Sequence, residues 1–208
     1  MKSNLHNSRI TKFYKLSILT AMALGDGCIN KNGTLCIQHS MKQYEYLCWK
    51  ARLIEEAFNT TINIKKREDV KFPYCRFYFT SKQTKRLREI LYSDKKHLDY
   101  RVLNLLKTPT ALTIWYLDDG SMVIHRNKER DKITGRELVI HTQNLTHDEH
   151  LTIRDWFKKN YNIGIRINKD RKYFKTVMSA KSAVKFLALL DNCIPVSMEY
   201  KTDMKYLY

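Results

Sequence analysis

Two aspartates in this sequence stand where a carboxylate is electrostatically disfavoured. Asp26 and Asp119 each follow an apolar, helix-forming run, and each precedes a glycine. The C-terminus of an α-helix carries partial negative charge, which disfavours a carboxylate there by a few tenths to about 1 kcal/mol. If the two helices pack side by side, both carboxylates meet, and such a pair stays ionised only when a cation joins it. Oxygen ligands without His or Cys nearby in sequence favour Mg²⁺ or a similar hard ion.

The two aspartates occupy matching points of a weak internal repeat. Residues 35–40 align without gaps with residues 138–143, and in the same register Ile54 meets Phe157 and Phe58 meets Tyr161. A single Asp-Gly after a helix is usually only a turn. Two of them at equivalent points of a repeat indicate a shared role.

Each half of the chain predicts the same order of elements. The first half predicts a helix ending near residues 25–27, a hairpin of 28–31 and 35–40, a helix over 41–58, strands at 62–67 and 74–80, and a helix over 81–92. The second predicts a helix from 108 to 117, a hairpin with a charged tip at 126–132, a helix capped by residues 146 and 149, strands near 163–167 and 173–178, and a helix over 180–190. We therefore expect an α+β fold of two pseudo-symmetric αββαββα subdomains, residues 1–104 and 105–208, each with a four-stranded antiparallel sheet.

The composition favours a folded protein that binds a polyanion. Lys and Arg number 38 against 21 Asp and Glu, a formal net charge of +17, and 43 % of the residues are hydrophobic. Such an excess of positive charge on a folded chain points first to nucleic acid and second to an anionic membrane surface. There is no run of about 18 apolar residues, so we expect no membrane span. The five cysteines form no C-x-x-C pair and are expected to be free, mostly buried thiols.

Residues 19–27, LTAMALGDG, and 112–120, LTIWYLDDG, resemble the two motifs of the monomeric LAGLIDADG homing endonucleases, particularly the I-SceI type. The resemblance covers nearly the whole chain, from about residue 14 to residue 203. It implies antiparallel sheets that form a DNA-binding saddle. It also implies a monomeric, site-specific DNA endonuclease that makes a metal-dependent double-strand break in a long asymmetric target.

The resemblance assigns the metal site to the ends of the two motifs. In this family the last aspartate of each motif binds the divalent metals that cleave DNA, which carries the metal-binding and catalytic roles to Asp26 and Asp119. The backbone carbonyls of Gly25 and Asp118 are expected to contribute further ligands. The expected ion is Mg²⁺, and Mn²⁺ or Ca²⁺ can occupy the same sites. Metals held between two carboxylates supply what phosphodiester hydrolysis needs.

Four further residues are expected to take part in catalysis. A lysine in each half usually accompanies the metals in this family, and Lys96 and Lys201 occupy symmetric places here. The polar residues beside the metals come from the second strand of each hairpin. Gln143 matches a family glutamine, and Ser40 takes the equivalent place in the first half.

The two sheets are expected to supply the DNA-binding surface. An antiparallel ribbon fits the major groove, and alternation along each strand directs one set of side chains toward the bases. The candidate groove-facing residues are Lys31, Asn32, Gln38, Lys65, Arg67, Arg76, Tyr78, Arg126, Lys128, His141, Arg166, Asn168, Lys172 and Lys175. Because the two half-sheets differ in sequence, the target is expected to be asymmetric.

Two alternatives remain open alongside the double-stranded DNA endonuclease. One is an RNA maturase on the same scaffold, which would assist splicing of its own intron RNA. The other is a non-catalytic DNA-binding regulator, although a regulator does not need both carboxylates. The expected compartment is intracellular, either an organelle (mitochondrion or chloroplast) or a bacterial or archaeal cytoplasm.

Overall fold

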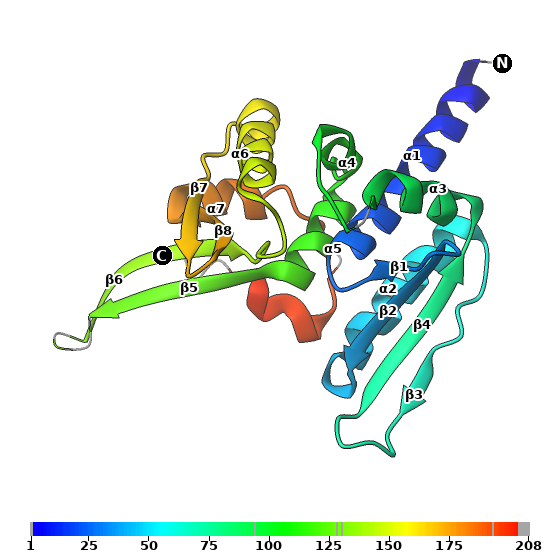
Figure 1. Cartoon of the computed structure of the whole chain (residues 1–208), viewed down its shortest axis with the longest axis horizontal. Helices are drawn as coiled ribbons and strands as arrows, with labels where there is room; N and C mark the ends of the chain where they lie inside the picture. The colour runs from blue at the N-terminus through cyan, green and yellow to red at the C-terminus, as the bar shows by residue number, and fades with distance from the viewer. Residues whose placement is uncertain (1, 94, 128, 130, 193, 204–208) are drawn as a thin grey trace.

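Two four-stranded antiparallel sheets, one from each half of the chain, form the framework of the computed structural model (Figure 1). The structure describes residues 2–203 except 94, 128, 130 and 193, with side chains from residue 12 onward. The first sheet has the strand order β1 (Cys28–Ile29), β2 (Thr34–Ser40), β4 (Tyr74–Thr80), β3 (Lys65–Arg67). The second sheet repeats this order with β5 (Gly120–Asn127), β6 (Lys132–Ile140), β8 (Tyr173–Ser179), β7 (Arg166–Asp170).

The helices also repeat, which confirms the predicted αββαββα order in both halves. The first half contributes α1 (Lys2–Leu24), α2 (Tyr44–Phe58) and α3 (Lys82–Leu91), with a 3₁₀ turn, η1 (Met41–Gln43), before α2. The second contributes α5 (Pro109–Asp119), α6 (His147–Tyr161) and α7 (Ala180–Leu187). Two elements were not predicted: α4 (Tyr100–Leu105), which packs against both α1 and α6, and the 3₁₀ helix η2 (Val196–Lys201).

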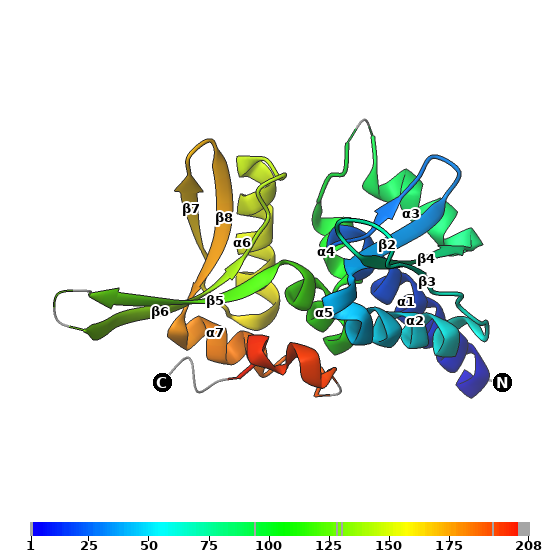
Figure 2. The ribbon, with the colours of Figure 1, turned by 90° about the horizontal axis from the view of Figure 1, so that it is seen from below.

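Helices α1 and α5 pack against each other at the centre of the molecule, and both sheets extend away from this pair (Figures 1 and 2). Thr20 of α1 and Thr113 of α5 are both fully buried, and each hydroxyl is satisfied within its own helix. Thr20 Oγ1 donates to the Leu16 carbonyl at 2.7 Å, and Thr113 Oγ1 donates to the Pro109 carbonyl at 2.9 Å. These threonines occupy the same position of the two motifs, so the pairing of the helices follows the sequence repeat.

Several predicted boundaries in the second half were wrong. The expected strand at 163–167 begins only at Arg166, because the buried side chains of Ile163 and Ile165 anchor the segment before it to the core. The hairpin tip is shorter than expected, since β5 and β6 stay paired out to Asn127 and Lys132 across a register shift.

One smaller expectation, that the cysteines are mostly buried, also fails. Among the four cysteines that the structure describes, only Cys75 is buried. The pair of capping side chains predicted at Thr146 and Glu149, by contrast, is confirmed at the start of α6. None of the described helices combines the length and apolar character that a membrane span requires.

Candidate active site

The two aspartates singled out by the repeat lie at equivalent helix ends. Asp26 follows the end of α1, and Asp119 is the last residue of α5. Between them, Gly25 meets Asp118, the residue at the same motif position in the other half. The Asp26 backbone N–H donates to Asp118 Oδ2 at 3.1 Å. A side chain at position 25 would collide with this carboxylate, because a Cβ there would lie 2.2 Å from Asp118 Oδ2.

The two predicted lysines make equivalent contacts with the two helix ends. Lys96 Nζ donates to the carbonyls of Leu24 and Gly27, each at 3.3 Å. Lys201 Nζ donates to the carbonyl of Leu117 at 2.6 Å. Leu24 and Leu117 hold the same motif position, so the two lysines contact equivalent carbonyls of the two halves. Each ammonium offsets the negative end of a helix dipole beside a carboxylate.

Both aspartates hold their protons unusually firmly. Burial, followed by the nearby Asp118 carboxylate, raises the pKa of Asp26 from 3.8 to about 6. Burial, then Asp118 and Asp26, raises the pKa of Asp119 from 3.8 to about 7. Burial also lowers the pKa of Lys96 and of Lys201, although the carboxylates around them oppose that shift. Crowded carboxylates of this kind are relieved when a cation binds.

The raised pKa values predict how the metal-free protein responds to pH. Between pH 4 and 7 the folded state binds more protons at Asp119 than the unfolded state, so the stability from this group is complete below pH 3.8 and falls as pH rises through about 7. We expect Asp119→Asn to raise the melting temperature in EDTA, with a larger gain at pH 8 than at pH 5. Asp155→Asn removes an exposed carboxylate and serves as the control. An equal gain at both pH values would contradict the expectation.

Each aspartate lines a pocket together with polar side chains that were predicted from the sequence. Asp119 shares one pocket with Lys96, His141 and Gln143. Asp26 shares another with Gln38 and Ser40, together with the unpredicted His39. Gln143 is held in place, since its Nε2 lies 3.2 Å from His141 Nδ1. The structure therefore brings Gln143 beside Asp119 and Ser40 beside Asp26, in the pairing that the repeat predicts.

The side chain of Asp118 has a structural role that was not predicted. This side chain is buried, and its Oδ1 accepts hydrogen bonds from Lys50 Nζ at 2.5 Å and from the Tyr46 hydroxyl at 2.7 Å. Lys50 Nζ also lies 3.1 Å from His39 Nε2. Tyr46 and Lys50 had a sequence signal, because both lie on the apolar face of α2, and a lysine there needs a buried partner. No local sequence pattern indicated that His39 would belong to this group.

The available oxygen atoms fit a divalent cation. Ligand atoms of Asp26, His39 and Asp118 lie within 4.8 Å of one another. The Asp118 carboxylate is already engaged by Lys50, Tyr46 and the Asp26 N–H, so its side chain is poorly placed to give up an oxygen. The carboxylates of Asp26 and Asp119 stay the predicted cation ligands, although Asp119 is not part of this 4.8 Å group. The carbonyls of Gly25 and Asp118 lie at helix ends, where the helix supplies no i+4 donor.

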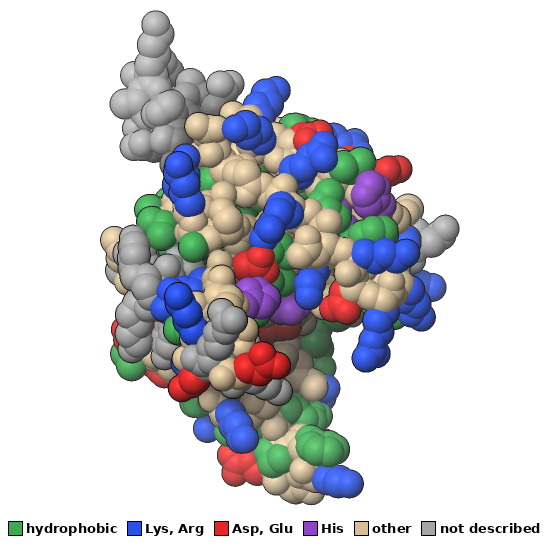
Figure 3. All heavy atoms as spheres, turned by 90° about the vertical axis from the view of Figure 1, so that its left-hand side faces the viewer, with side chains coloured by type: hydrophobic (Ala, Val, Ile, Leu, Met, Phe, Trp, Pro, Cys, Tyr) green, Lys and Arg blue, Asp and Glu red, His purple; other side chains and the backbone are tan. Residues whose placement is uncertain are grey.

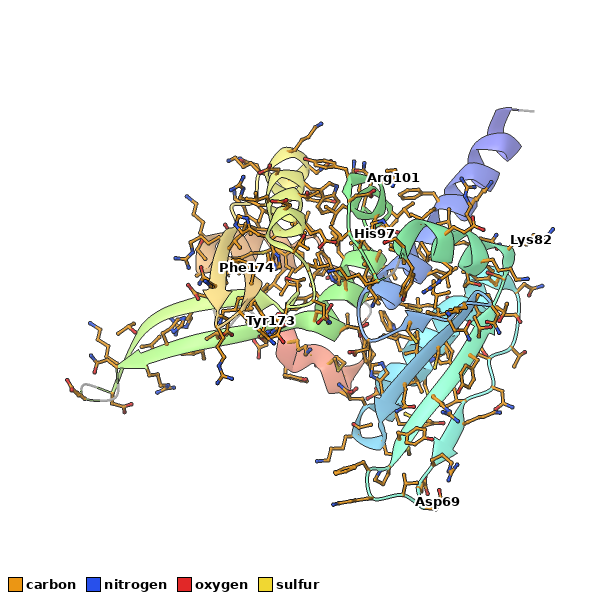
Figure 4. All side chains as sticks on the ribbon, viewed as in Figure 1. Asp69, Lys82, His97, Arg101, Tyr173 and Phe174 are labelled. Atoms are coloured by element: carbon orange, nitrogen blue, oxygen red, sulfur yellow. The ribbon has the colours of Figure 1, made fainter. Side chains whose placement is uncertain are left out.

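The exposed face of the first sheet carries most of the DNA-contact residues predicted there. Cross-strand partners lie on one face of a sheet, and the register pairs Gln38 with Arg76, Lys65 with Arg76, and Cys36 with Tyr78. Arg67 joins the same face opposite Tyr74 and is paired with Asp69 at the turn between β3 and β4 (Figure 4). Lys31 and Asn32 are exposed in the β1–β2 turn.

The second sheet presents a comparable face with one exception. Asn168 pairs with Lys175, and Arg166 lies two residues away on the same face. Lys172 is exposed in the β7–β8 turn, and His141 extends the face beyond β6. Arg126 lies on the opposite face, because it follows His125 in the alternation of β5. Lys128 lies outside the described residues. Viewed from the β5–β6 end, the surface shows more Lys and Arg than Asp and Glu (Figure 3).

Comparison with known proteins gives one family match and several fold matches. The model of the LAGLIDADG DNA endonuclease family matches residues 16–186. The chain is 27 % identical over 199 residues to the protein RecA of Mycobacterium shimoidei and 25 % identical over 201 residues to that of Mycobacterium leprae, covering 90 % of this chain in each case. It spans 46 % of the first protein and 27 % of the second, so it corresponds to about half or less of these relatives.

The fold matches extend over nearly the whole chain. The homing endonuclease I-WcaI bound to its DNA recognition sequence superposes with a TM-score of 0.73 at 20 % identity, covering 91 % of this chain and 86 % of that one. The meganuclease I-AabMI bound to uncleaved DNA gives 0.55 at 11 % identity, covering 91 % and 87 %. The N-terminal LAGLIDADG domain of WhiA gives 0.51 at 14 % identity, covering 90 % and 86 %. The expected fold is therefore confirmed, whereas the narrower likeness to the I-SceI type stays a prediction.

Proposed function

This chain belongs to the LAGLIDADG DNA endonuclease family, and from that premise we propose that it is a site-specific endonuclease that makes a metal-dependent double-strand break in an asymmetric DNA target. One observation carries the proposal. Two carboxylates lie at equivalent ends of packed helices, and a lysine contacts the same motif carbonyl in each half. A protein that only binds DNA does not need this duplicated set.

The charge distribution supports DNA as the substrate. The chain carries a formal net charge of +17, and the exposed faces of both sheets present Lys, Arg, Asn and Gln side chains. Such side chains bind phosphates and read base edges in the major groove. I-WcaI and I-AabMI, which share the fold, are bound to DNA in their structures. Because the two faces carry different residues, the two halves of the target are expected to differ.

The residues around each carboxylate have distinct roles in the proposed reaction. Asp26 and Asp119 would hold divalent cations, each aspartate at its own pocket and each serving one DNA strand, with Mg²⁺ as the proposed ion. When bound, such an ion makes water nucleophilic at neutral pH and stabilises the leaving oxygen. Lys96 and Lys201 neutralise charge on the phosphate as it develops. Gln143 and Ser40 offer hydrogen bonds that orient the attacking water in their respective pockets.

Metal removal provides the test of this function. The purified protein is incubated with a library of randomised DNA duplexes in Mg²⁺, in Mn²⁺ or in EDTA, and the cut ends are sequenced. We expect cuts within one long sequence when Mg²⁺ or Mn²⁺ is present and no cuts in EDTA, because the carboxylates alone cannot activate water. The matched control is the double variant Asp26→Asn/Asp119→Asn in Mg²⁺, which is expected to yield no cut ends.

Other outcomes separate the alternatives. Cutting that persists in EDTA would contradict a metal-dependent mechanism. Selective binding without cutting in either ion would favour a DNA-binding regulator. Preferential binding to a structured RNA over every DNA duplex would favour a maturase.

A further inference from the structure

The surroundings of the two carboxylates differ at three equivalent positions. In the register of the repeat, His39 corresponds to Thr142 and Lys50 to Ile153, while Asp118 corresponds to Gly25 in the motif alignment. Thr142 is bonded away from the site, to His150. Ile153 is an apolar core residue. Beside Asp26 there is therefore a buried polar network of His39, Lys50 and Asp118, and the described residues at the three equivalent positions beside Asp119 form no such network.

The network fixes the tautomer of His39. An ammonium group can only donate hydrogen bonds, and Lys50 Nζ lies 3.1 Å from His39 Nε2. Nε2 must therefore accept, which puts the ring proton on Nδ1. Nδ1 lies 3.6 Å from Asp26 Oδ2, just beyond hydrogen-bond distance, so its N–H lies beside the carboxylate of the proposed metal ligand without a direct hydrogen bond to it. The His39 side chain is only 2 % exposed, so the ring has little freedom to turn away.

Asp26 is consequently contacted at two points, one at its backbone and one beside its carboxylate. The Asp118 carboxylate accepts a hydrogen bond from the Asp26 backbone N–H, and the His39 ring lies beside the Asp26 carboxylate. The other carboxylate is held differently. The backbone carbonyl of Asp119 accepts from the His141 N–H at 2.7 Å, but within the part of the chain that the structure describes no hydrogen bond reaches its carboxylate.

We propose that His39, oriented by Lys50, is a positioning residue for Asp26, so that the two DNA strands are cut by unequally held carboxylates and only one strand depends on His39. This inference rests on the proposed endonuclease function. A hydrogen-bond donor behind a metal-binding carboxylate keeps its lone pairs directed toward the ion, and loss of such a partner typically costs about 10- to 100-fold in activity or affinity. The second half has only Thr142 at the equivalent point, so the effect is confined to one strand.

Two substitutions of nearly equal size test this. In His39→Asn the amide nitrogen replaces Nδ1 and keeps a donor facing Asp26. In His39→Gln the amide lies at the place of Nε2, where it meets Lys50 and leaves Asp26 without the donor. Each variant is mixed in excess with its target duplex, carrying a different fluorophore on each strand, and Mg²⁺ starts a single turnover. The two strand rates are fitted separately.

We expect His39→Gln to slow one strand by about 10-fold or more relative to the other. His39→Asn should change the ratio of strand rates by less than about 3-fold. The control Thr142→Val, at the equivalent position, should leave that ratio unchanged. DNA binding in EDTA and the melting temperature are measured for each variant, because loss of folded protein slows both strands equally.

The possible results are distinct. Equal slowing of both strands by His39→Gln would overturn the proposal and leave His39 a structural residue. Slowing of the same strand to the same extent by His39→Asn would also overturn it, because the donor beside Asp26 would then have no effect. Absence of cutting by the unsubstituted protein would instead refute the proposed endonuclease function.

Discussion

Replacing either Asp26 or Asp119 by asparagine is expected to lower the rate of DNA cleavage by about 1,000-fold or more. Each substitution removes a charged ligand from the proposed metal site, where a metal ion contributes several kcal/mol to stabilising the transition state. Every 1.4 kcal/mol corresponds to a factor of 10 in rate. The measurement is the single-turnover rate with the target duplex in Mg²⁺.

DNA binding should survive these two substitutions. Most of the expected DNA contacts come from the sheet faces, although Gln38 and His141 lie beside the carboxylates, and losing a carboxylate reduces repulsion of the phosphates. Affinity is measured in EDTA, at one fixed salt concentration, by fluorescence anisotropy. Asp155→Asn, which neutralises an exposed carboxylate on α6, is the control for charge alone. Cleavage within about 10-fold of the unsubstituted rate in both site variants would show that the carboxylates are not the catalytic ligands.

Removing the buried ammonium of Lys50 is expected to be the most destabilising single change in the first half. Lys50→Met leaves the Asp118 carboxylate buried, fully enclosed and without its counter-ion. Removing one partner of a buried ion pair typically costs about 3–5 kcal/mol, because the remaining charge is uncompensated. The free energy of unfolding is measured by urea denaturation at pH 8, where an isolated carboxylate would be charged.

A double-mutant cycle separates this explanation from simple loss of packing. In Lys50→Met/Asp118→Asn no unpaired charge remains, so the double variant should be more stable than Lys50→Met alone. Lys159→Met replaces an exposed lysine of α6 and is expected to change the free energy of unfolding by less than about 0.5 kcal/mol. If the double variant is less stable than the single one, the charge of Asp118 is not the cause.

Much of the fold could be predicted from the sequence, because the repeat applies the same pattern twice. Strand β4 follows from its alternation of apolar and polar residues, and α6 from the Thr146 cap and its apolar spacing. Boundaries near Ile163 were missed because a buried extended segment and a strand share one apolar pattern. Helix α4 is short and lacks a full amphipathic period, so no sequence pattern predicted it.

The residues of the candidate site could be predicted where the two halves of the chain match, and could not be predicted where they differ. Lys96 and Lys201 were found because their placement repeats, although neither lies near its aspartate in sequence. His39 has no matching residue in the other half, so comparison of the halves could not reveal it. His150, whose buried ring is bonded to Thr142, also has no counterpart in the other half, since Leu47 stands at the equivalent position.

The contact between Gly25 and Asp118 makes the two halves of this chain non-interchangeable. A homodimer of two first halves would bring glycine against glycine, opening a void and leaving Lys50 without its counter-ion. A homodimer of two second halves would press aspartate against aspartate at the same point. A symmetric dimer made from one half of the chain, intended to cut a palindromic target, would therefore need a redesigned contact at positions 25 and 118 before any change to the DNA-binding faces of the sheets.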